Sequence, residues 1–387
     1  MLYKPVDQLY QIIDQIGAGG YGKVYKAKRI DPKDADPAKT KTISKDHKPS
    51  ETDPTDLTPN SSPLIPTIST FPTPDQLVAL KMIRVETEQE GFPLTAVREV
   101  QLLRSLSSEF VVSLLDIVTS PTSVYLVFEY LPWDLAGLLL HPATATITAS
   151  QIKCLMKQLL QCIGYLHSRN VLHRDIKSAN FLLSSNGTLK VADFGLAKQL
   201  SAQKNECLTN RVVTIWYRPP EILLGSTAYG PEVDLWGIGC IFGELFLKKP
   251  PFVWGSCEVS QLECIFESFG PLEGNLVREC YSKLPYGDLV KFVVRKEEIA
   301  DTAVISQTLQ AYKRAMSTEG WNLFLRLLDL DPKRRITAQE ALKHPYFTEE
   351  APQECPKEEL ATLLEGEWHE FETKNLRRKR WSSEVKM

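Results

Sequence analysis

One stretch of the chain gathers side chains that suit the transfer of a phosphate group. The run HRDIKSAN contains Asp175, Lys177 and Asn180, and the run DFG begins at Asp193. A carboxylate at Asp175 accepts the proton of an attacking hydroxyl, and the ammonium of Lys177 neutralises a phosphoryl group in transfer. Oxygen atoms of Asn180 and Asp193 are ligands that Mg²⁺ prefers. These four residues, in this order, predict phosphoryl transfer with Mg²⁺ as cofactor.

A glycine-rich segment near the N-terminus is the second candidate. Residues 17–24 read GAGGYGKV, a G-x-G-x-x-G-x-V pattern. A dinucleotide-binding fold needs a helix after such glycines, whereas the GKVYKAKRI that follows looks like a strand. A glycine-rich turn between two strands lets backbone atoms approach phosphates closely. Lys81, in the strand-like VALK, is then a candidate to hold the α- and β-phosphates if Glu99 pairs with it.

The elements that must position these residues change character along the chain. Strand-like spacing of apolar residues occurs at 9–30, 76–87, 111–118 and 123–131. After residue 134 the periodicity becomes mostly helical. We therefore expect an α+β protein in which a small β-rich part precedes a larger α-rich part.

The run GFPLTAVREVQLLRSL predicts one unusual helix over residues 93–106. At about 100° per residue, Ala96, Val100 and Leu103 share one face, and Glu99 projects close to it. Apolar residues also occupy a different side, for which a monomer offers no core. The pattern indicates a helix that buries a carboxylate and leaves a second apolar side for another contact.

A polar segment separates the first two strand-like regions. Residues 31–74 are rich in Pro, Ser, Thr, Asp and Lys. Such a composition buries little apolar surface, so we expect a disordered insertion between two strands. It is either an inert linker or a phosphorylated region, since it contains Thr58-Pro59, Ser62-Pro63 and Thr73-Pro74.

The composition argues against several other classes of protein. The chain has 387 residues, which is long for one core and favours two lobes or domains. Its net charge of −3 gives no overall basic field, so we predict no direct nucleic-acid site. We expect no membrane association, since no run approaches the roughly 18 apolar residues of a membrane span, and no secretory leader is visible. Eight cysteines without a C-x-x-C pair indicate reduced thiols rather than a zinc site.

Together these features resemble the eukaryotic protein kinases, from residue 9 to about residue 347. Further landmarks of that family are WYRPPE, which ends at Glu221, DLWG, which begins at Asp234, and LDPKRR, which ends at Arg335. The resemblance implies a bilobal kinase fold and a buried Glu221–Arg335 ion pair. It sets the domain boundaries as an N-lobe at 1–131 with the 31–74 insertion, a C-lobe at 132–347 and a C-terminal tail at 348–387.

The resemblance also implies an ATP site, with backbone groups of Glu129 and Leu131 on the adenine. It adds Thr214 to the catalytic residues Asp175 and Lys177, and it assigns the metal to Asn180 and Asp193. The ATP-binding residues that it implies are Ile16, Gly17, Ala18, Gly19, Gly20, Tyr21, Gly22, Lys23, Val24, Ala79, Lys81, Glu99, Phe128, Glu129, Leu131, Asp134 and Leu182.

Within the kinases, GFPLTAVRE resembles the signature helix of the cyclin-dependent kinases. An exposed apolar patch is typical of a partner surface, and the resemblance implies that the partner is a cyclin. Cyclin docking would push the helix inward and complete the Lys81–Glu99 pair. We therefore expect the isolated chain to be nearly inactive.

Thr209 matches the activating threonine of this family, which another kinase phosphorylates. The resulting phosphate would bind nearby cations, and the resemblance implies Arg98, Arg174 and Lys198 in that role. The family has an arginine where this chain has Lys198. Because a lysine lacks the bidentate fork of a guanidinium, we expect this contact to be weaker.

Val212, Val213 and Arg218 resemble the family's pocket for a proline directly after the target residue. A strained backbone carbonyl there turns away and pairs with Arg218, so it cannot accept an N–H from the substrate. Proline has no N–H to leave unsatisfied. The resemblance therefore implies Ser-Pro and Thr-Pro targets.

Several details resemble the transcriptional branch, the Ctk and cyclin-K-dependent kinases. Pro219 stands where cell-cycle members usually have alanine, and GELFLKKP and the tail motif WHE also match this branch. The resemblance implies a K- or T-like cyclin, the C-terminal repeat domain of RNA polymerase II as substrate, and a nuclear location with a cytoplasmic pool left open. In the tail, the RRKR run (377–380) is a solvated end or a nuclear-import signal in one interpretation. In the other, His369 and Glu370 fold back near the nucleotide and the RRKR run steadies it.

Two alternatives remain open at this point. The chain is a cyclin-dependent kinase of cell-cycle or general Ser-Pro specificity, or it is a pseudokinase that serves only as a cyclin-binding scaffold. A pseudokinase predicts the loss of at least one of Lys81, Asp175, Asn180 and Asp193, and all four are present.

Overall fold

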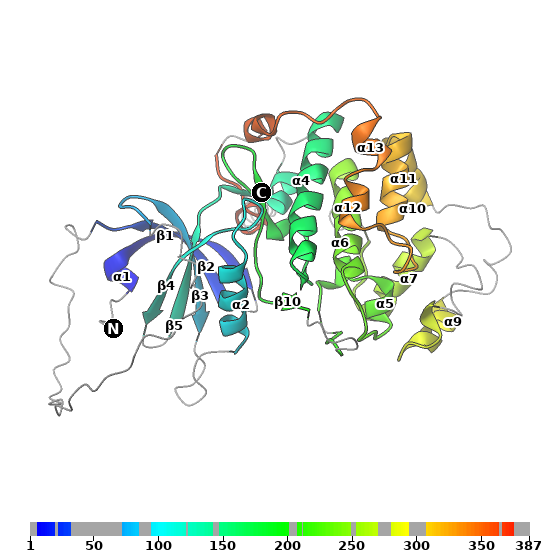
Figure 1. Cartoon of the computed structure of the whole chain (residues 1–387), viewed down its shortest axis with the longest axis horizontal. Coiled ribbons are helices and arrows are strands. Elements are labelled where there is room, and N and C mark those ends of the chain that lie inside the picture. The colour runs from blue at the N-terminus through cyan, green and yellow to red at the C-terminus, as the bar shows by residue number, and fades with distance from the viewer. Residues whose placement is uncertain are drawn as a thin grey trace, which may run out of the picture. The chain divides into compact units, whose positions relative to one another are not determined.

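The computed structural model describes most of the chain in two units, which Figure 1 shows by element. Unit 1 comprises the chain up to Pro93 together with Leu103–Ser105 and Ser113–Tyr130, and unit 2 comprises the rest. The described residues are 6–19, 22–31, 72–84, 94–120, 123–141, 147–200, 207–210, 212–248, 253–269, 280–293, 307–363 and 366–374. Gly20, Tyr21, most of the 31–74 insertion and the RRKR run lie outside them.

Unit 1 is built on a five-stranded antiparallel sheet in the order β1-β2-β3-β5-β4. Its elements are α1 (Val6–Leu9), β1 (Tyr10–Gly19), β2 (Gly22–Arg29), β3 (Leu77–Arg84), β4 (Leu114–Ser120) and β5 (Ser123–Glu129). Val78 and Leu80 occupy alternate positions of β3 and therefore point to the same face of the sheet. Both are fully buried in its core. The core is completed by Tyr10, Ala27, Leu115, Val118 and Val127.

The strand predicted over 111–118 begins later, at Leu114, and runs to Ser120. Val111 and Val112 pair elsewhere, with Val191 of unit 2. Val112 N donates to Val191 O over 3.0 Å, and Val111 forms a parallel bridge to the same residue. The apolar run 111–118 is therefore not one strand. Its first two residues pair with Val191, and the residues from Leu114 onward pair with β5.

Helix α2 (Leu94–Ser105) covers nearly the range predicted for it. Ala96, Glu99 and Leu103 are buried, at spacings of three and four residues that place them on one face. Val100, which we expected on this face, is only half-buried. The carboxylate of Glu99 thus lies within the buried stripe rather than beside it.

Unit 2 is mostly helical and carries two small sheets. Its helices are α3 (Leu135–Leu140), α4 (Ala149–Ser168), α5 (Pro220–Leu223), α6 (Glu232–Leu247), α7 (Glu258–Phe269), α9 (Val290–Val293), α10 (Gln307–Ala315), α11 (Thr318–Leu327), α12 (Ala338–Ala341) and α13 (Pro345–Thr348). Short 3₁₀ turns are η3 (Ser178–Asn180), η4 (Ile215–Tyr217), η6 (Gly287–Leu289) and η8 (Lys357–Thr362). The strands are β6 (Trp133–Asp134), β7 (Val171–Leu172), β8 (Phe181–Leu183), β9 (Leu189–Val191) and β10 (Lys198–Gln199), paired as β6-β8-β9 and β10-β7.

Helix α6 is the central helix of unit 2. Every residue from Val233 to Leu245 is buried, which is the expected state of a helix that is apolar all round. Helix α4, by contrast, begins with a capping box between Thr148 and Gln151 and buries one face. Among the described residues, none of the helices is long and apolar enough to span a membrane.

Candidate active site

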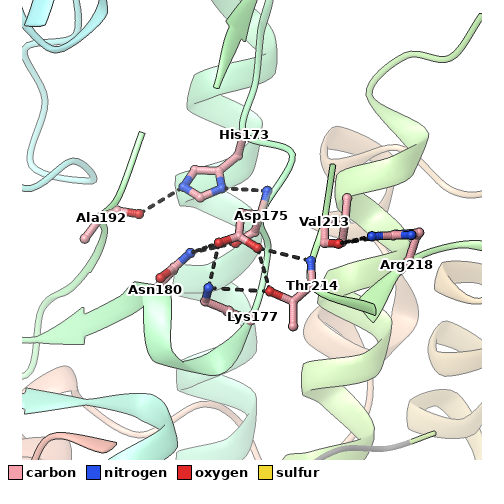
Figure 2. A network of polar contacts seen from close by, with 8 residues as sticks. All are labelled: His173, Asp175, Lys177, Asn180, Ala192, Val213, Thr214 and Arg218. Carbon is pink, nitrogen blue, oxygen red and sulfur yellow. Dashed lines mark hydrogen bonds and ion pairs between the residues drawn. The ribbon is translucent and has the colours of Figure 1, made fainter. Parts of the chain in front are cut away.

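The catalytic candidates of unit 2 converge on the carboxylate of Asp175, as Figure 2 shows. Asp175 Oδ1 accepts hydrogen bonds from Thr214 Oγ1 at 2.8 Å and from Thr214 N at 3.2 Å. Asp175 Oδ2 lies 2.6 Å from Lys177 Nζ and 3.1 Å from Asn180 Nδ2. Residues up to 39 positions apart thus meet at one carboxylate, which presents a proton acceptor beside an ammonium group.

The loop that carries Asp175 is held by hydrogen bonds to Asp234 of α6. The two oxygens of this buried carboxylate accept the backbone N–H groups of His173 and Arg174 at 3.0 and 2.9 Å. His167 Nε2 lies 2.9 Å from Asp234 Oδ2. Burial by itself would raise the pKa of Asp234, but the hydrogen bond and charge of His167 and the bond from Arg174 N hold it below its ordinary value. Asp234 therefore stays ionised and anchors the loop.

His173 connects this loop to the segment before Asp193. Its ring is fully buried, it accepts from Asp175 N through Nδ1 at 3.3 Å, and its Nε2 lies 3.0 Å from Ala192 O. Because Nδ1 accepts, the proton is on Nε2, which donates to Ala192 O. The ring of Phe194 packs edge-on against His173 with centroids 5.3 Å apart. The histidine thereby fixes the two loops that hold Asp175 and Asp193 relative to each other.

Backbone strain is concentrated in these loops. Arg174, Asp193 and Val213 have φ angles of 63°, 62° and 65°, in the left-handed region. For a β-branched residue such as Val213 this conformation is a rare exception. Each such residue costs about 1–3 kcal/mol and persists only where its surroundings enforce it.

Hydrogen bonds to Arg218 hold Val213 in its strained backbone conformation. Val213 O accepts from Arg218 Nη2 at 3.0 Å and from Arg218 Nε at 3.3 Å, while Val213 N donates to Arg174 O at 2.9 Å. Val212 and Val213 are both buried. The carbonyl is therefore turned into the protein and occupied by a guanidinium, which is the pairing that the family resemblance implied (Figure 2).

The candidate metal ligands offer the oxygen atoms that a hard cation requires. Asn180 Nδ2 donates to Asp175 O at 2.7 Å as well as to the Asp175 carboxylate, so its Oδ1 is the atom suited to a metal. Asp193 is half-buried at the start of the DFG run. An amide oxygen and a carboxylate fit Mg²⁺, which needs few protein ligands and keeps waters or phosphates in its remaining positions.

The residues predicted to bind a phosphate on Thr209 also lie in unit 2. Thr209 and Arg98 are exposed, and Lys198 is half-buried in β10. Arg174 Nε donates to Leu196 O at 2.7 Å, and Arg174 Nη1 donates to Tyr229 OH at 3.3 Å.

Tyr229 is a contact that the sequence did not predict. Its hydroxyl donates to Thr209 O at 2.6 Å, so it links Arg174 to the backbone of the candidate phosphosite. Burial raises the pKa of Tyr229, with smaller opposing effects from Arg174. Tyr229 therefore remains a neutral hydroxyl that donates at physiological pH.

Several candidate nucleotide-binding residues of unit 1 lie at neighbouring positions on adjacent strands of its sheet. Val24 of β2 is the register partner of Lys81 in β3, and Ala79 of β3 is the partner of Phe128 in β5. Lys81 is buried, with 8% of its surface exposed. Gly22 has φ 136°, and a Cβ there would lie 2.0 Å from Met82 O, so only glycine fits this turn. The remaining described candidates of unit 1 are Ile16, Gly17, Ala18, Gly19, Lys23 and Glu129.

In unit 2, the nucleotide candidates Leu131 and Asp134 contact the C-terminal tail. His369 Nε2 lies 3.0 Å from Leu131 O, one of the backbone groups assigned to adenine. Asp134 Oδ1 caps α3 by accepting Gly137 N at 2.6 Å, and Asp134 Oδ2 accepts Glu370 N at 2.8 Å. From the sequence we expected only that His369 and Glu370 lie near the nucleotide. In the structure Asp134 has a structural role, because it caps α3 and binds the backbone of the tail. Leu182 pairs with Asp134 between β8 and β6.

The tail fits closely against α3. A Cβ on residue 137 would lie 2.5 Å from Trp368 O, so only a glycine at this position lets the two backbones approach. Trp133 Nε1 donates to Gly366 O at 2.7 Å, and the rings of His141 and Trp368 lie 4.1 Å apart. Burial, opposed by the bonds from Gly137 and Glu370, raises the pKa of Asp134 to about 7.

The convergence of Thr214, Lys177 and Asn180 on the carboxylate of Asp175, a two-unit fold and a glycine-rich turn define a protein kinase. The sequence matches the protein kinase domain over residues 72–347, and the chain belongs to this family. It has the protein kinase fold, with a β-rich N-lobe in unit 1 and a helical C-lobe in unit 2, so the predicted family and fold class are confirmed. Membership implies ATP and a divalent metal.

Among its relatives are a CTD kinase subunit and a cyclin-dependent kinase. The CTD kinase subunit alpha of Schizosaccharomyces pombe is 41% identical over 373 residues, which cover 96% of this chain and 54% of the relative. Cyclin-dependent kinase 12 of Drosophila melanogaster is 37% identical over 382 residues, covering 96% of this chain and 28% of the relative. The chain therefore spans about half or less of the length of these two relatives.

A solved structure is also similar to this chain. One chain of the crystal structure of the yeast RNA Pol II CTD kinase CTDK-1 complex matches it with a TM-score of 0.68 and 34% identity. The match covers 92% of this chain and 98% of that chain. The similarity to this kinase therefore extends over nearly the whole chain.

Proposed function

We propose that this chain is a cyclin-dependent serine/threonine kinase that phosphorylates Ser-Pro and Thr-Pro sites in the C-terminal repeat domain of RNA polymerase II. The observation that carries the chemistry is the convergence of Thr214, Lys177 and Asn180 on Asp175. The names of its relatives, CTD kinase subunit alpha and cyclin-dependent kinase 12, support the choice of substrate. They also make a cell-cycle or general Ser-Pro kinase the less favoured alternative.

In the proposed reaction, Asp175 accepts the proton of the substrate hydroxyl. Lys177, 2.6 Å from Asp175 Oδ2, supplies positive charge beside the attacking oxygen. Thr214 Oγ1 holds the other carboxylate oxygen at 2.8 Å and so fixes the direction in which the proton acceptor points. Positioning of this kind supplies most of the catalysis in phosphoryl transfer, because little covalent chemistry is left to the protein.

ATP supplies the phosphoryl group, and Mg²⁺ neutralises its charge when both are bound. Asn180 Oδ1 and the Asp193 carboxylate are the proposed metal ligands. The proposed ATP-binding residues are those of the glycine-rich turn and of β3 and β5 in unit 1, with Leu131, Asp134 and Leu182 in unit 2. Lys81 and Glu99, both buried, are proposed to form the pair that positions the phosphates.

The proposed target sequence follows from the carbonyl of Val213. Because Arg218 already occupies this acceptor with bonds of 3.0 and 3.3 Å, it is withdrawn from any N–H of a bound peptide. A residue other than proline after the target serine would leave its own N–H without a partner, at a cost of about 1–3 kcal/mol. Proline carries no N–H and avoids this cost. The polymerase repeat that the family resemblance implies as substrate is dense in Ser-Pro.

Two inputs are proposed to switch the enzyme on. A transcriptional cyclin, K- or T-like, would dock on α2 and set the position of Glu99. An activating kinase would phosphorylate Thr209, whose phosphate would bind Arg98, Arg174 and Lys198. Tyr229, which joins Arg174 to Thr209 O, keeps the unmodified segment close to this site. The proposed location is the nucleus, as the polymerase substrate requires.

The decisive experiment is a phosphotransfer assay with candidate cyclins, ATP and Mg²⁺. We expect a K- or T-like cyclin to support phosphorylation of a polymerase repeat peptide in strong preference to a histone peptide. The Asp175→Asn variant should lose about 10²–10⁴-fold in kcat, the usual contribution of a general base. Asp288→Asn, a change at an exposed carboxylate that pairs with Lys291, is the matched control and should leave kcat unchanged.

The outcomes separate the alternatives. Equal labelling of histone and repeat peptides favours general Ser-Pro specificity. Cyclin binding without any phosphotransfer, and with no effect of Asp175→Asn, would point to a scaffold and end the proposal of a kinase activity.

A further inference from the structure

A surface next to the proposed proline pocket carries an exposed tryptophan. Trp254 is 69% exposed, and Val259 close to it is 43% exposed. Single exposed apolar side chains are ordinary, so exposure alone assigns no role. These two residues, however, flank Glu258, which forms an ion pair with Arg218 at 2.5 Å. The wall of the proposed pocket therefore continues into this surface.

Trp254 is joined to the catalytic residues through η4. Trp216 of η4 packs edge-on against Trp254 with ring centroids 5.9 Å apart. Directly before η4 lies Thr214, which binds Asp175, and directly after it lies Arg218, which binds Val213 O. The half-buried Trp216 and the exposed Trp254 thus lie in contact beside the residues proposed to hold the target Ser-Pro.

The loop on both sides of Trp254 is fixed. Trp216 Nε1 donates to Gly255 O at 3.1 Å, and Gly255 N donates to Gln261 Oε1 at 2.6 Å. A Cβ on residue 255 would lie 2.2 Å from Gln261 N, so a glycine is required there. Val253, on the other side, is buried. The indole of Trp254 is therefore presented to solvent by an ordered loop, and a pre-organised surface loses little entropy when it binds.

We propose that Trp254 and Trp216 form a shelf that binds a second proline of the substrate, C-terminal to the Ser-Pro target; this inference rests on the proposed function. Segments rich in proline adopt the extended polyproline II helix before binding and dock on aromatic surfaces at low entropic cost. The guanidinium of Arg218, which follows Trp216 by two residues, is already paired with Glu258 and with Val213 O. The shelf therefore favours an uncharged ring over an acidic or phosphorylated residue.

The test compares peptides that differ only in the second proline. A parent peptide has one Ser-Pro followed by alanines, and each derivative carries one additional proline at a single downstream position. We expect wild-type enzyme with its cyclin to show a lower KM for at least one derivative. An aromatic contact contributes about 0.5–1.5 kcal/mol, so a difference of about fivefold in KM is expected.

The variants assign this preference to the shelf. Trp254→Ala should raise KM for the preferred derivative about fivefold to that of the parent, with kcat and the parent's KM unchanged. Trp254→Phe should restore at least half of the preference, because it retains a ring. Leu325→Ala, at another exposed apolar residue of unit 2, is the matched control and should leave the preference intact.

Three results would overturn this inference. The first is a wild-type enzyme that phosphorylates the parent and all derivatives equally, which leaves the proposed function standing. The second is a Trp254→Ala variant whose kcat falls equally for all peptides, since the residue would then act only through Trp216 on the catalytic loop. The third is a wild-type oligomer that Trp254→Ala dissociates, which would assign the shelf to a second copy of this chain. If no Ser-Pro peptide is labelled at all, the proposed function fails together with the inference.

Discussion

The proposed proline requirement gives the sharpest prediction, because the proposal assigns it to one side chain. Arg218 is largely buried, with 13% of its side chain exposed, and it binds Val213 O through Nε and Nη2. Replacing it by leucine retains apolar bulk but releases the carbonyl. A free acceptor at Val213 is then available to the N–H of any residue that follows the target serine.

The magnitude follows from the cost of an unsatisfied N–H. In the wild-type enzyme this cost is about 1–3 kcal/mol. It corresponds to a preference of about 5- to 150-fold in kcat/KM for a Ser-Pro peptide over the matched Ser-Ala peptide. In Arg218→Leu we expect this ratio to fall to within about threefold of one, because most of the cost disappears.

The assay is the ratio of kcat/KM for the two peptides, measured with the same enzyme preparation. Any loss of folded protein cancels in this ratio, which separates specificity from stability. Glu258→Gln is the matched control, since it removes the ion pair with Arg218 and leaves both bonds to Val213 O in place. This control should retain the preference of the wild-type enzyme.

One result would refute the reasoning. If Arg218→Leu lowers kcat/KM for both peptides and leaves their ratio unchanged, the occupied carbonyl is not the source of the proline requirement. An equal loss of preference in Glu258→Gln would also contradict it, because the ion pair and not the carbonyl would then set the specificity.

The remaining predictions concern the buried ion pair, the tail and one carboxyl group. Arg335, whose side chain is fully buried, binds Glu221 at 2.8 and 3.2 Å. Glu221→Gln should therefore lower the free energy of unfolding in urea by about 3–5 kcal/mol. Asp288→Asn, which removes an exposed ion pair, is the control and should leave the urea midpoint of unfolding unchanged. Deleting residues 366–387 removes the His369 contact to Leu131 O and should weaken the affinity for ATP in the cyclin-bound enzyme, measured by calorimetry; an unchanged affinity would exclude a role of the tail at the nucleotide. Burial raises the pKa of Asp134 from 3.8 to about 7, so the folded state binds the proton more tightly than the unfolded state between these values. The free energy of unfolding should therefore decline as pH rises from about 4 to about 7, and Asp134→Asn should flatten that decline; an identical slope in the variant would contradict this assignment.

Much of the candidate site was predictable because its residues are close together in the sequence. Asp175, Lys177 and Asn180 lie within six positions, so the local loop suffices to bring them together once it folds. The same holds for the α2 stripe, where helical spacing alone places Glu99 and Leu103 on one face. The pairing of Arg218 with Val213 O also spans only five residues.

Other contacts could not be read from spacing, because they join residues far apart. Tyr229 reaches Thr209 O across 20 residues, and His369 reaches Leu131 O across 238 residues. No local pattern marks such pairs, since many polar side chains compete for each exposed backbone group until packing selects one.

The sequence by itself determined which chemistry we propose for this protein, because the proposed proton acceptor, cation and metal ligands are specified by residue type within short segments. Only the tertiary structure decided that the tail docks on Asp134 and that Trp254 extends the surface beside Arg218. Both contacts depend on which loops the helices of unit 2 bring side by side. The arrangement of these helices is decided by burial of apolar surface throughout the unit and not by any one motif.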